Sequence, residues 1–169
     1  MMSLHAPILE TRTLAWPDES ACAAWAGALA SRPGLHDACI ELHGPLGVGK
    51  TTFVRHLLRA LGVQGRVKSP TYALMESYES QQFGPDSGAE PLQIWHFDFY
   101  RFNDPQDWED AGFREVFGAR GLKLVEWPEQ ARGLLPQADL RIDIEPGAGD
   151  ARSIVLTAHT PTGLALLMA

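Results

Sequence analysis

The residues with the clearest chemistry lie together in one glycine-rich segment. The segment reads Gly44, Pro45, Leu46, Gly47, Val48, Gly49, Lys50 and Thr51. It fits the pattern G-x-x-x-x-G-K-[ST], in which glycines let successive backbone N–H groups point at phosphate oxygens. In that pattern the lysine ammonium reaches the β- and γ-phosphates, and the final hydroxyl ligates Mg²⁺. The segment therefore predicts a loop that binds a nucleoside triphosphate with its magnesium ion.

The flanking residues provide the elements that such a loop needs. Residues 38–43 form a short apolar run with the character of a strand, and residues 51–61 carry apolar side chains at helical spacing. Strand, glycine loop and helix in this order place the positive end of the helix dipole at the phosphates. The alternative, a glycine-rich turn before an ordinary helix, explains less of this context.

Two carboxylates follow apolar runs and are candidates for the magnesium side of the site. Asp98 ends the run at residues 92–97, and Glu126 ends the run at residues 122–125. Ligands bind at such strand ends in open α/β sheets. One division of roles gives Asp98 the metal or its water and Glu126 the attacking water, and the opposite division is open. Either acid can instead bond backbone amides at its strand end.

Three further residues deserve an assignment. Thr71 lies in a Ser-Pro-Thr turn, where a hydroxyl can sense the γ-phosphate or simply start the next strand. His96 is expected to be a packed strand histidine. Trp127 is expected in the core, or lining the site because it directly follows Glu126.

The chain has no N-K-x-D or T-K-x-D motif for reading guanine, so ATP is the expected nucleotide.

Composition restricts the class of protein. The chain has 169 residues, 45% of them hydrophobic, which predicts one domain spanning 1–169 with flexible tails at 1–10 and 160–169. A net charge of −7 argues against a broad nucleic-acid surface. No apolar run predicts a membrane span, no secretion signal is evident, and no Cys/His spacing predicts zinc. Two unpaired cysteines fit a reducing cytosol, so a cytoplasmic protein is expected.

The order of the remaining patterns predicts the fold class. Helices are expected at about 19–30 and from Pro105, and strands are expected at 72–78, 92–100, 122–127, 140–145 and 153–158. Residues 79–91 are expected to form a long hairpin tip. Together these patterns predict a three-layer α/β P-loop NTPase whose central sheet is mixed, mostly parallel and flanked by helices.

Several of these segments together resemble one family, the bacterial TsaE ATPases of tRNA threonylcarbamoyladenosine biosynthesis. The resemblance is carried by five stretches of the chain. They are residues 16–19, 44–52, 68–72 (Lys-Ser-Pro-Thr-Tyr), 96–101 (His-Phe-Asp-Phe-Tyr-Arg) and 125–128 (Val-Glu-Trp-Pro). The phosphate loop is common to many families, whereas the last three stretches in this order are far more specific.

The resemblance implies a P-loop fold, ATP hydrolysis with Mg²⁺, and a partnership with the complex that transfers threonylcarbamoyl to tRNA. It leaves direct contact with tRNA open. The nucleotide is implied to contact residues 44–52, Glu19 and Trp127, and Glu126 is implied to touch the metal. Pro45 departs from the family, which often has an acid there, and the hairpin tip at 79–91 is longer than usual.

The leading hypothesis is a Mg²⁺-dependent ATPase that is slow without its partners and uses Lys50, Thr71, Asp98 and Glu126. The first alternative is a P-loop small-molecule kinase, with residues 112–120 as its lid. The second is a nucleotide-dependent adaptor that does not hydrolyse.

Overall fold

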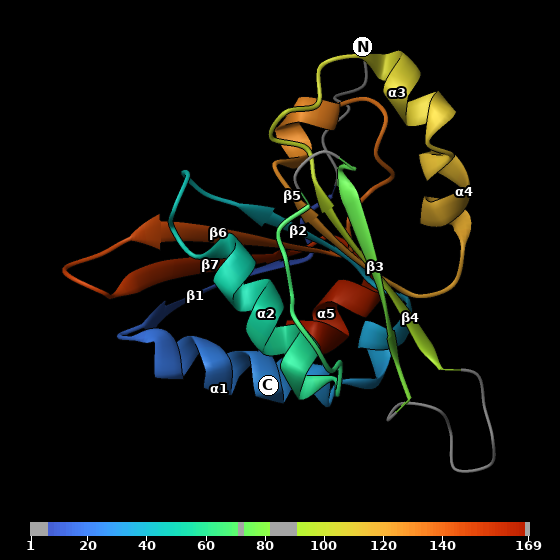
Figure 1. Ribbon diagram of the computed structural model, residues 1–169. Helices are drawn as coiled ribbons and strands as arrows, with labels where there is room; N and C mark the ends of the chain where they lie inside the picture. Colours follow the sequence, from blue (N-terminus) through green and yellow to red (C-terminus); the bar gives the residue numbers. More distant parts are fainter. Residues whose placement is uncertain (1–6, 71–72, 82–90, 168–169) are drawn as a thin grey trace.

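The computed structural model describes residues 7–70, 73–81 and 91–167 (Figure 1). They contain one seven-stranded sheet in the order β1-β7-β6-β2-β5-β4-β3. The strands are β1 (Glu10–Trp16), β2 (Cys39–His43), β3 (Met75–Ser80), β4 (Leu92–Asp98), β5 (Leu122–Glu126), β6 (Leu140–Pro146) and β7 (Arg152–Ala158). The helices are α1 (Glu19–Ala30), α2 (Lys50–Ala60), α3 (Pro105–Asp110), α4 (Phe113–Gly118) and α5 (Pro161–Leu167), with 3₁₀ turns η1 (Pro33–Asp37) and η2 (Pro128–Ala131).

Helices cover the two faces of the sheet unequally. Ile94 of β4 and Leu124 of β5 belong to the larger apolar core, which includes buried residues of α1, α2 and α5. Phe97 and Val125 have the opposite parity on the same strands and pack in a second core with α3 and α4. Because successive strand side chains point to opposite faces, helices lie on both sides of the sheet (Figure 1).

The expected mostly parallel sheet is wrong, because only half of the pairings are parallel. Strand β2 pairs parallel with β5 and β6, and β4 pairs parallel with β5. The pairs β1–β7, β6–β7 and β3–β4 are antiparallel. Two of these antiparallel pairs join consecutive strands, and the third adds the N-terminal strand β1 at one edge.

Most of the expected elements are present at nearly the expected bounds. Helix α1 begins after Asp18, whose side chain accepts a hydrogen bond from the amide of Ala21, and Asp104 caps α3 in the same way. The segment expected as a flexible C-terminal tail instead contains α5, which buries Leu166 and packs on β6 and β7. Strand β1 and helix α4 were not predicted. Residues 82–90, the middle of the hairpin tip expected at 79–91, lie outside the described residues.

No helix in the described ranges is long and apolar enough to cross a bilayer.

Candidate nucleotide site

The glycine-rich loop follows β2 directly and leads into α2. Gly44 has φ +148°, and a Cβ added there would lie 2.5 Å from the carbonyl oxygen of Ile144. Gly49, at φ +115°, is the residue before α2 and has the left-handed conformation that favours glycine. Gly44 therefore lets the loop lie directly against β6, and Gly49 lets it turn into the helix.

Lys50 points back across the loop from the first turn of α2. Its Nζ donates a hydrogen bond to the carbonyl of Gly44 and lies 3.6 Å from the centre of the Trp127 ring. Burial lowers the pKa of Lys50, while the carboxylates of Glu126, Glu129 and Asp98 act to raise it. The side chain is 4% exposed, so the ammonium occupies a largely dry position among acidic groups.

Thr51 and Glu126 join α2 to the end of β5. The Thr51 hydroxyl donates to both carboxylate oxygens of Glu126, at 3.0 Å each. Glu126 is 2% exposed and lies near the N-terminus of α2, where the helix dipole favours negative charge. This contact places a partly buried hydroxyl and a buried carboxylate side by side at the start of the helix.

His96 completes this buried network from β4. Its Nε2 lies 2.5 Å from Oε2 of Glu126, and the whole side chain is inaccessible to solvent. An ionised carboxylate only accepts hydrogen bonds, so His96 donates from Nε2. Its other ring nitrogen is buried without a partner among the described residues. His96 is thus a strand histidine oriented toward the site, a role that its position in the sequence did not indicate.

The backbone at Trp127 directs the indole over the lysine. Trp127 has φ +54° and ψ +49°, an uncommon conformation for a residue other than glycine. A non-glycine residue held there costs on the order of 1–3 kcal/mol and is found most often at functional sites. Tyr100 packs against the same ring, with the ring centres 4.9 Å apart. Of the two positions expected for Trp127, in the core or lining the site, the structure has the second.

Asp98 lies beside Glu126 but has different partners. The two residues are register neighbours on the parallel strands β4 and β5. Asp98 accepts hydrogen bonds from the amide of Tyr100 at 3.0 Å and the hydroxyl of Ser69 at 3.2 Å. Burial raises the pKa of Asp98, and nearby Glu126 raises it further, while those two hydrogen bonds lower it. Of the two acids, Glu126 is the one in contact with Thr51.

A cavity of about 300 Å³ lies beside the loop on the side of α1. Its lining includes Glu19, which also bonds His56 at 2.9 Å, and Thr52. Trp16 and Arg152 line it from register-paired positions of β1 and β7. Arg152 donates from Nε to the carbonyl of Val48 at 2.8 Å and so braces the loop from outside.

Most of the residues predicted from the sequence gather here. Lys50, Thr51, Glu126 and Trp127 form one cluster with Asp98 next to it, and Glu19 and Thr52 line the adjoining cavity. Leu46 projects from the outer turn of the loop and is 70% exposed. In that turn the carbonyl of Pro45 accepts a hydrogen bond from the amide of Val48. Thr71 lies outside the described residues.

Sequence reasoning missed Arg152 and Asp150, both of which line the cavity. Only the pairing of β1 with β7 brings Trp16 to Arg152. The turn before β7 was the one available signal for Asp150, but nothing in it indicated the loop as its neighbour.

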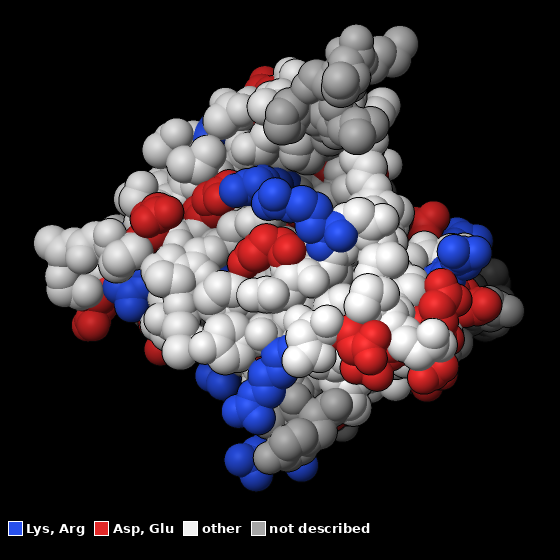
Figure 2. All heavy atoms as spheres, turned by 90° about the horizontal axis from the view of Figure 1, so that it is seen from above, with Lys and Arg blue, Asp and Glu red and all other residues white. Residues whose placement is uncertain are grey.

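Charges of both signs meet on the face of the molecule seen from above. Figure 2 shows acidic side chains beside basic ones near the middle of this face, with uncharged surface around them. Among the residues whose placement is described, no group of three or more His, Cys, Asp and Glu side chains is arranged to hold a metal ion.

Comparisons with known proteins agree with this architecture. Residues 16–154 match the family model described as "Threonylcarbamoyl adenosine biosynthesis protein TsaE". The tRNA threonylcarbamoyladenosine biosynthesis protein TsaE of Haemophilus influenzae is 41% identical over 130 residues, covering 77% of this chain and 76% of that protein. Its Bacillus subtilis counterpart is 36% identical over 142 residues, covering 84% and 81%. The crystal structure of Bacillus subtilis YdiB superposes with a TM-score of 0.69 at 25% identity, covering 94% of this chain and 92% of that one. The chain therefore belongs to the TsaE family, whose members take part in tRNA threonylcarbamoyladenosine biosynthesis.

Proposed function

We propose that this chain is a Mg²⁺-dependent ATPase of tRNA threonylcarbamoyladenosine biosynthesis that acts with the proteins transferring the threonylcarbamoyl group. The observation that carries the proposal is the contact of Thr51 with Glu126 at the start of α2, beside the ammonium of Lys50. This contact brings together the hydroxyl, carboxylate and ammonium that a phosphate loop uses.

The donor set fits a magnesium ion. Mg²⁺ prefers oxygen ligands and is usually held by one or two carboxylates together with phosphates and waters. Thr51 and Glu126 would supply such oxygens, and Asp98 is proposed to hold a water beside them. When bound, the ion would neutralise charge on the β- and γ-phosphates. The absence of a larger acidic cluster in the described residues is compatible with this way of holding the metal.

The protein groups have separate roles in the proposed reaction. The N–H groups of the loop and the Lys50 ammonium bind the phosphates, and the Trp127 ring holds that ammonium in place. Thr71 is proposed to sense the γ-phosphate. The 300 Å³ cavity is proposed to take the adenosine, between Glu19 and Arg152. No arginine lies in a recognisable finger motif, so turnover is expected to be slow until a partner binds, since a missing positive group costs about 10³- to 10⁵-fold in rate.

The test compares Glu126→Gln with Glu115→Gln, a matched change on the exposed surface of α4. ATP binding is measured by calorimetry with Mg²⁺, and phosphate release is measured with and without the threonylcarbamoyl-transferase proteins. We expect Glu126→Gln to lose turnover and Glu115→Gln to keep it. Brisk turnover by the isolated chain that partners leave unchanged would refute the proposed mechanism.

Two other functions predict different outcomes, which phosphorylation of a metabolite and partner binding by the Glu126→Gln variant would reveal. A small-molecule kinase would place the phosphate on a metabolite instead of releasing it. The proposed lid of such a kinase, residues 112–120, is occupied by α4, whose Phe113 is buried in the second core. A non-hydrolysing adaptor would bind its partners equally well after Glu126→Gln and would show no turnover to lose.

A further inference from the structure

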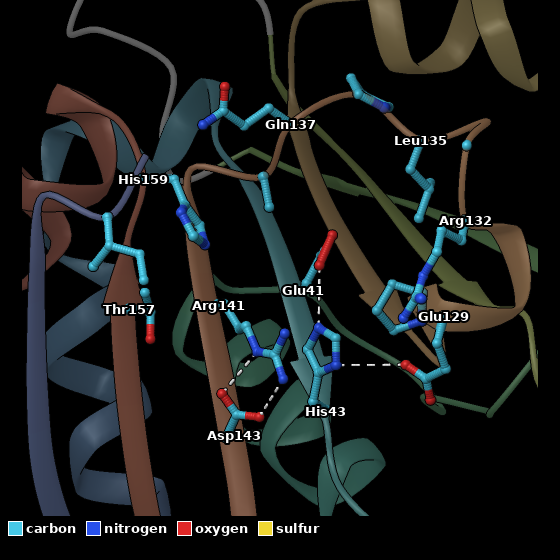
Figure 3. A pocket seen from close by; sticks show the side chains of 15 residues that line it. Glu41, His43, Glu129, Arg132, Leu135, Gln137, Arg141, Asp143, Thr157 and His159 are labelled. Carbon is cyan, nitrogen blue, oxygen red and sulfur yellow. Dashed lines mark hydrogen bonds and ion pairs between the residues drawn. The ribbon is translucent and has the colours of Figure 1, made fainter. Parts of the chain in front are cut away.

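A second and larger cavity, of about 940 Å³, lies on the opposite face of the sheet from α1, α2 and α5. Its floor is formed by β2, β6 and β7, and η2 with the segment at 132–138 forms one wall (Figure 3). Glu41 and His43 point into it, alternating with Ile40 and Leu42, which point into the larger core. Helices α3 and α4 cover the β4–β5 part of this face, so this cavity marks the part of the sheet they leave open.

The polar groups on the floor are already arranged in contacts. His43 places Nε2 3.1 Å from Glu41 and Nδ1 3.4 Å from Glu129 (Figure 3). A neutral imidazole has only one N–H, so only the protonated ring can donate to both carboxylates. Arg141 donates from Nε and Nη2 to the two oxygens of Asp143, at 2.8 and 2.9 Å.

The balance of these charges favours a cation as the ligand. Three carboxylates, from Glu41, Glu129 and Asp143, face one guanidinium that is fixed within the floor, that of Arg141. Arg141 bonds both oxygens of Asp143, so among the described residues the carboxylates of Glu41 and Glu129 contact the His43 ring and form no ion pair with a lysine or arginine. Arg132 lies at the rim and is exposed to solvent. Phosphate-rich ligands such as RNA would meet these acids unfavourably.

Apolar groups on the walls indicate that the cation comes from a polypeptide. Ile8 is 64% exposed, and it lines the cavity together with Leu135 and Pro136. The segment carrying Ile8 contacts the end of β7, because Nδ1 of His159 donates to the carbonyl of Pro7 and the amide of Leu9 donates to the carbonyl of Ala158, at 2.8 Å each. The cavity is also far larger than a guanidinium or an ammonium group, so it has room for a backbone and a neighbouring side chain.

We infer that this cavity is a docking site for an arginine or lysine side chain of a partner polypeptide, with an adjacent apolar side chain packed against Ile8 and Leu135. The cationic group would bond Glu41 and Glu129 in place of the His43 ring. Because His43 directly precedes Gly44, the docking site and the phosphate loop lie on the same end of β2. The inference concerns a different surface from the nucleotide site and does not depend on ATP hydrolysis.

The test uses a peptide probe and the whole chain without nucleotide. N-acetyl-leucyl-arginine amide is titrated into ¹⁵N-labelled protein, and N-acetyl-leucyl-citrulline amide, of equal shape but without charge, is the control probe. We expect the arginine probe to shift the amide signals of Glu41, His43 and Asp143. Glu129→Gln should weaken this binding about tenfold, the effect of losing one charge-assisted hydrogen bond, whereas Glu115→Gln should leave it unchanged.

Several results would overturn the inference. They are equal binding of the citrulline probe, shifts confined to other surfaces, or unchanged affinity in both Glu129→Gln and Glu41→Gln. The second variant keeps the test decisive if the first does not fold, which the dispersion of the spectrum reports. Equally tight binding of free ethylguanidinium would show a site for small cations and would refute the polypeptide partner.

Discussion

Replacing His96 tests whether the buried network around Glu126 orients the candidate magnesium ligand. His96→Leu removes the donor 2.5 Å from Oε2 of Glu126 and replaces it with an apolar side chain of similar bulk in β4. Among the described residues, Thr51 is then the one side chain left that donates a hydrogen bond to that carboxylate. His96→Gln keeps an amide N–H at about the reach of Nε2 and serves as the conservative variant.

The expected size of the effect follows from the chemistry of this one bond. A hydrogen bond to a charged group contributes about 1.5–3 kcal/mol. If the bond positions Glu126 equally in the transition state, its loss lowers turnover by about 10- to 150-fold, since 1.36 kcal/mol corresponds to a factor of ten. Removing one partner of a buried charged pair also destabilises the fold, by roughly 3–5 kcal/mol where the pair is fully ionised.

The assay must separate misplacement of Glu126 from simple loss of stability. Phosphate release is measured against Mg²⁺ concentration at a temperature where urea unfolding shows each variant to be folded. His96→Leu should need more Mg²⁺ for half of its maximal rate, and His96→Gln should recover most of the loss. His159→Leu, in the larger cavity on the other face, is the matched control. A folded His96→Leu protein with the rate and Mg²⁺ dependence of the wild type would refute this reasoning.

Three further predictions concern the loop and the strand ends. Lys50→Met should abolish ATP binding in calorimetry. The melting temperature of the nucleotide-free protein should stay unchanged or rise, because burial lowers the pKa of Lys50 and so disfavours its charge in the folded state. A clear drop in melting temperature would contradict this. Arg152→Met should weaken ATP binding by about tenfold through loss of the bond to Val48, whereas Arg114→Met, at an exposed position of α4, should not. Asp98→Asn should raise the melting temperature at pH 7, because a carboxyl whose pKa is raised in the fold destabilises the folded state once it is ionised. That gain should shrink as the pH falls through the raised pKa toward the ordinary carboxyl range, and a gain that stays constant with pH would contradict the assignment.

The parts of the fold that could be predicted are those with local signals. The glycine-rich loop between β2 and α2 was expected from its residue spacing together with the apolar segments on either side, and Asp104 before Pro105 marked the start of α3. Strand β1 was missed because three of its central residues are exposed, so its sequence lacks a clear apolar alternation. It is a strand because it pairs with β7 over seven residues, about 140 positions later in the chain. The two hairpins were expected and predicted a mixed sheet, but the additional β1–β7 pair makes half of the pairings antiparallel, so the sheet is not mostly parallel.

The candidate site shows the same limit at the level of single residues. Sequence could name Asp98 and Glu126 but could not choose between them, because both end apolar strands of similar character. The choice depends on which strand end meets the first turn of α2, and in the structure Thr51 contacts Glu126 alone of the two. His96 gave no local signal either, since its partner is 30 residues away and its alternation with Ile94 is that of an ordinary core strand.

The buried polar groups at this site are costly to the fold, which favours a functional reason for their arrangement. Lys50, His96 and Glu126 are all at most 4% exposed, and a buried charge is tolerated only when it is paired and hydrogen-bonded. Each of them contacts a residue of another element. Glu126 contacts Thr51 of α2 and His96 of β4, and Lys50 contacts the ring of Trp127, which follows β5. Because Thr51 and His96 both contact Glu126, the end of β5 is connected directly to the first turn of α2 and to β4. The adjacent strained backbone of Trp127 is maintained by the same contacts. This arrangement is the reason that His96, through its contact with Glu126, is expected to alter the magnesium dependence of turnover.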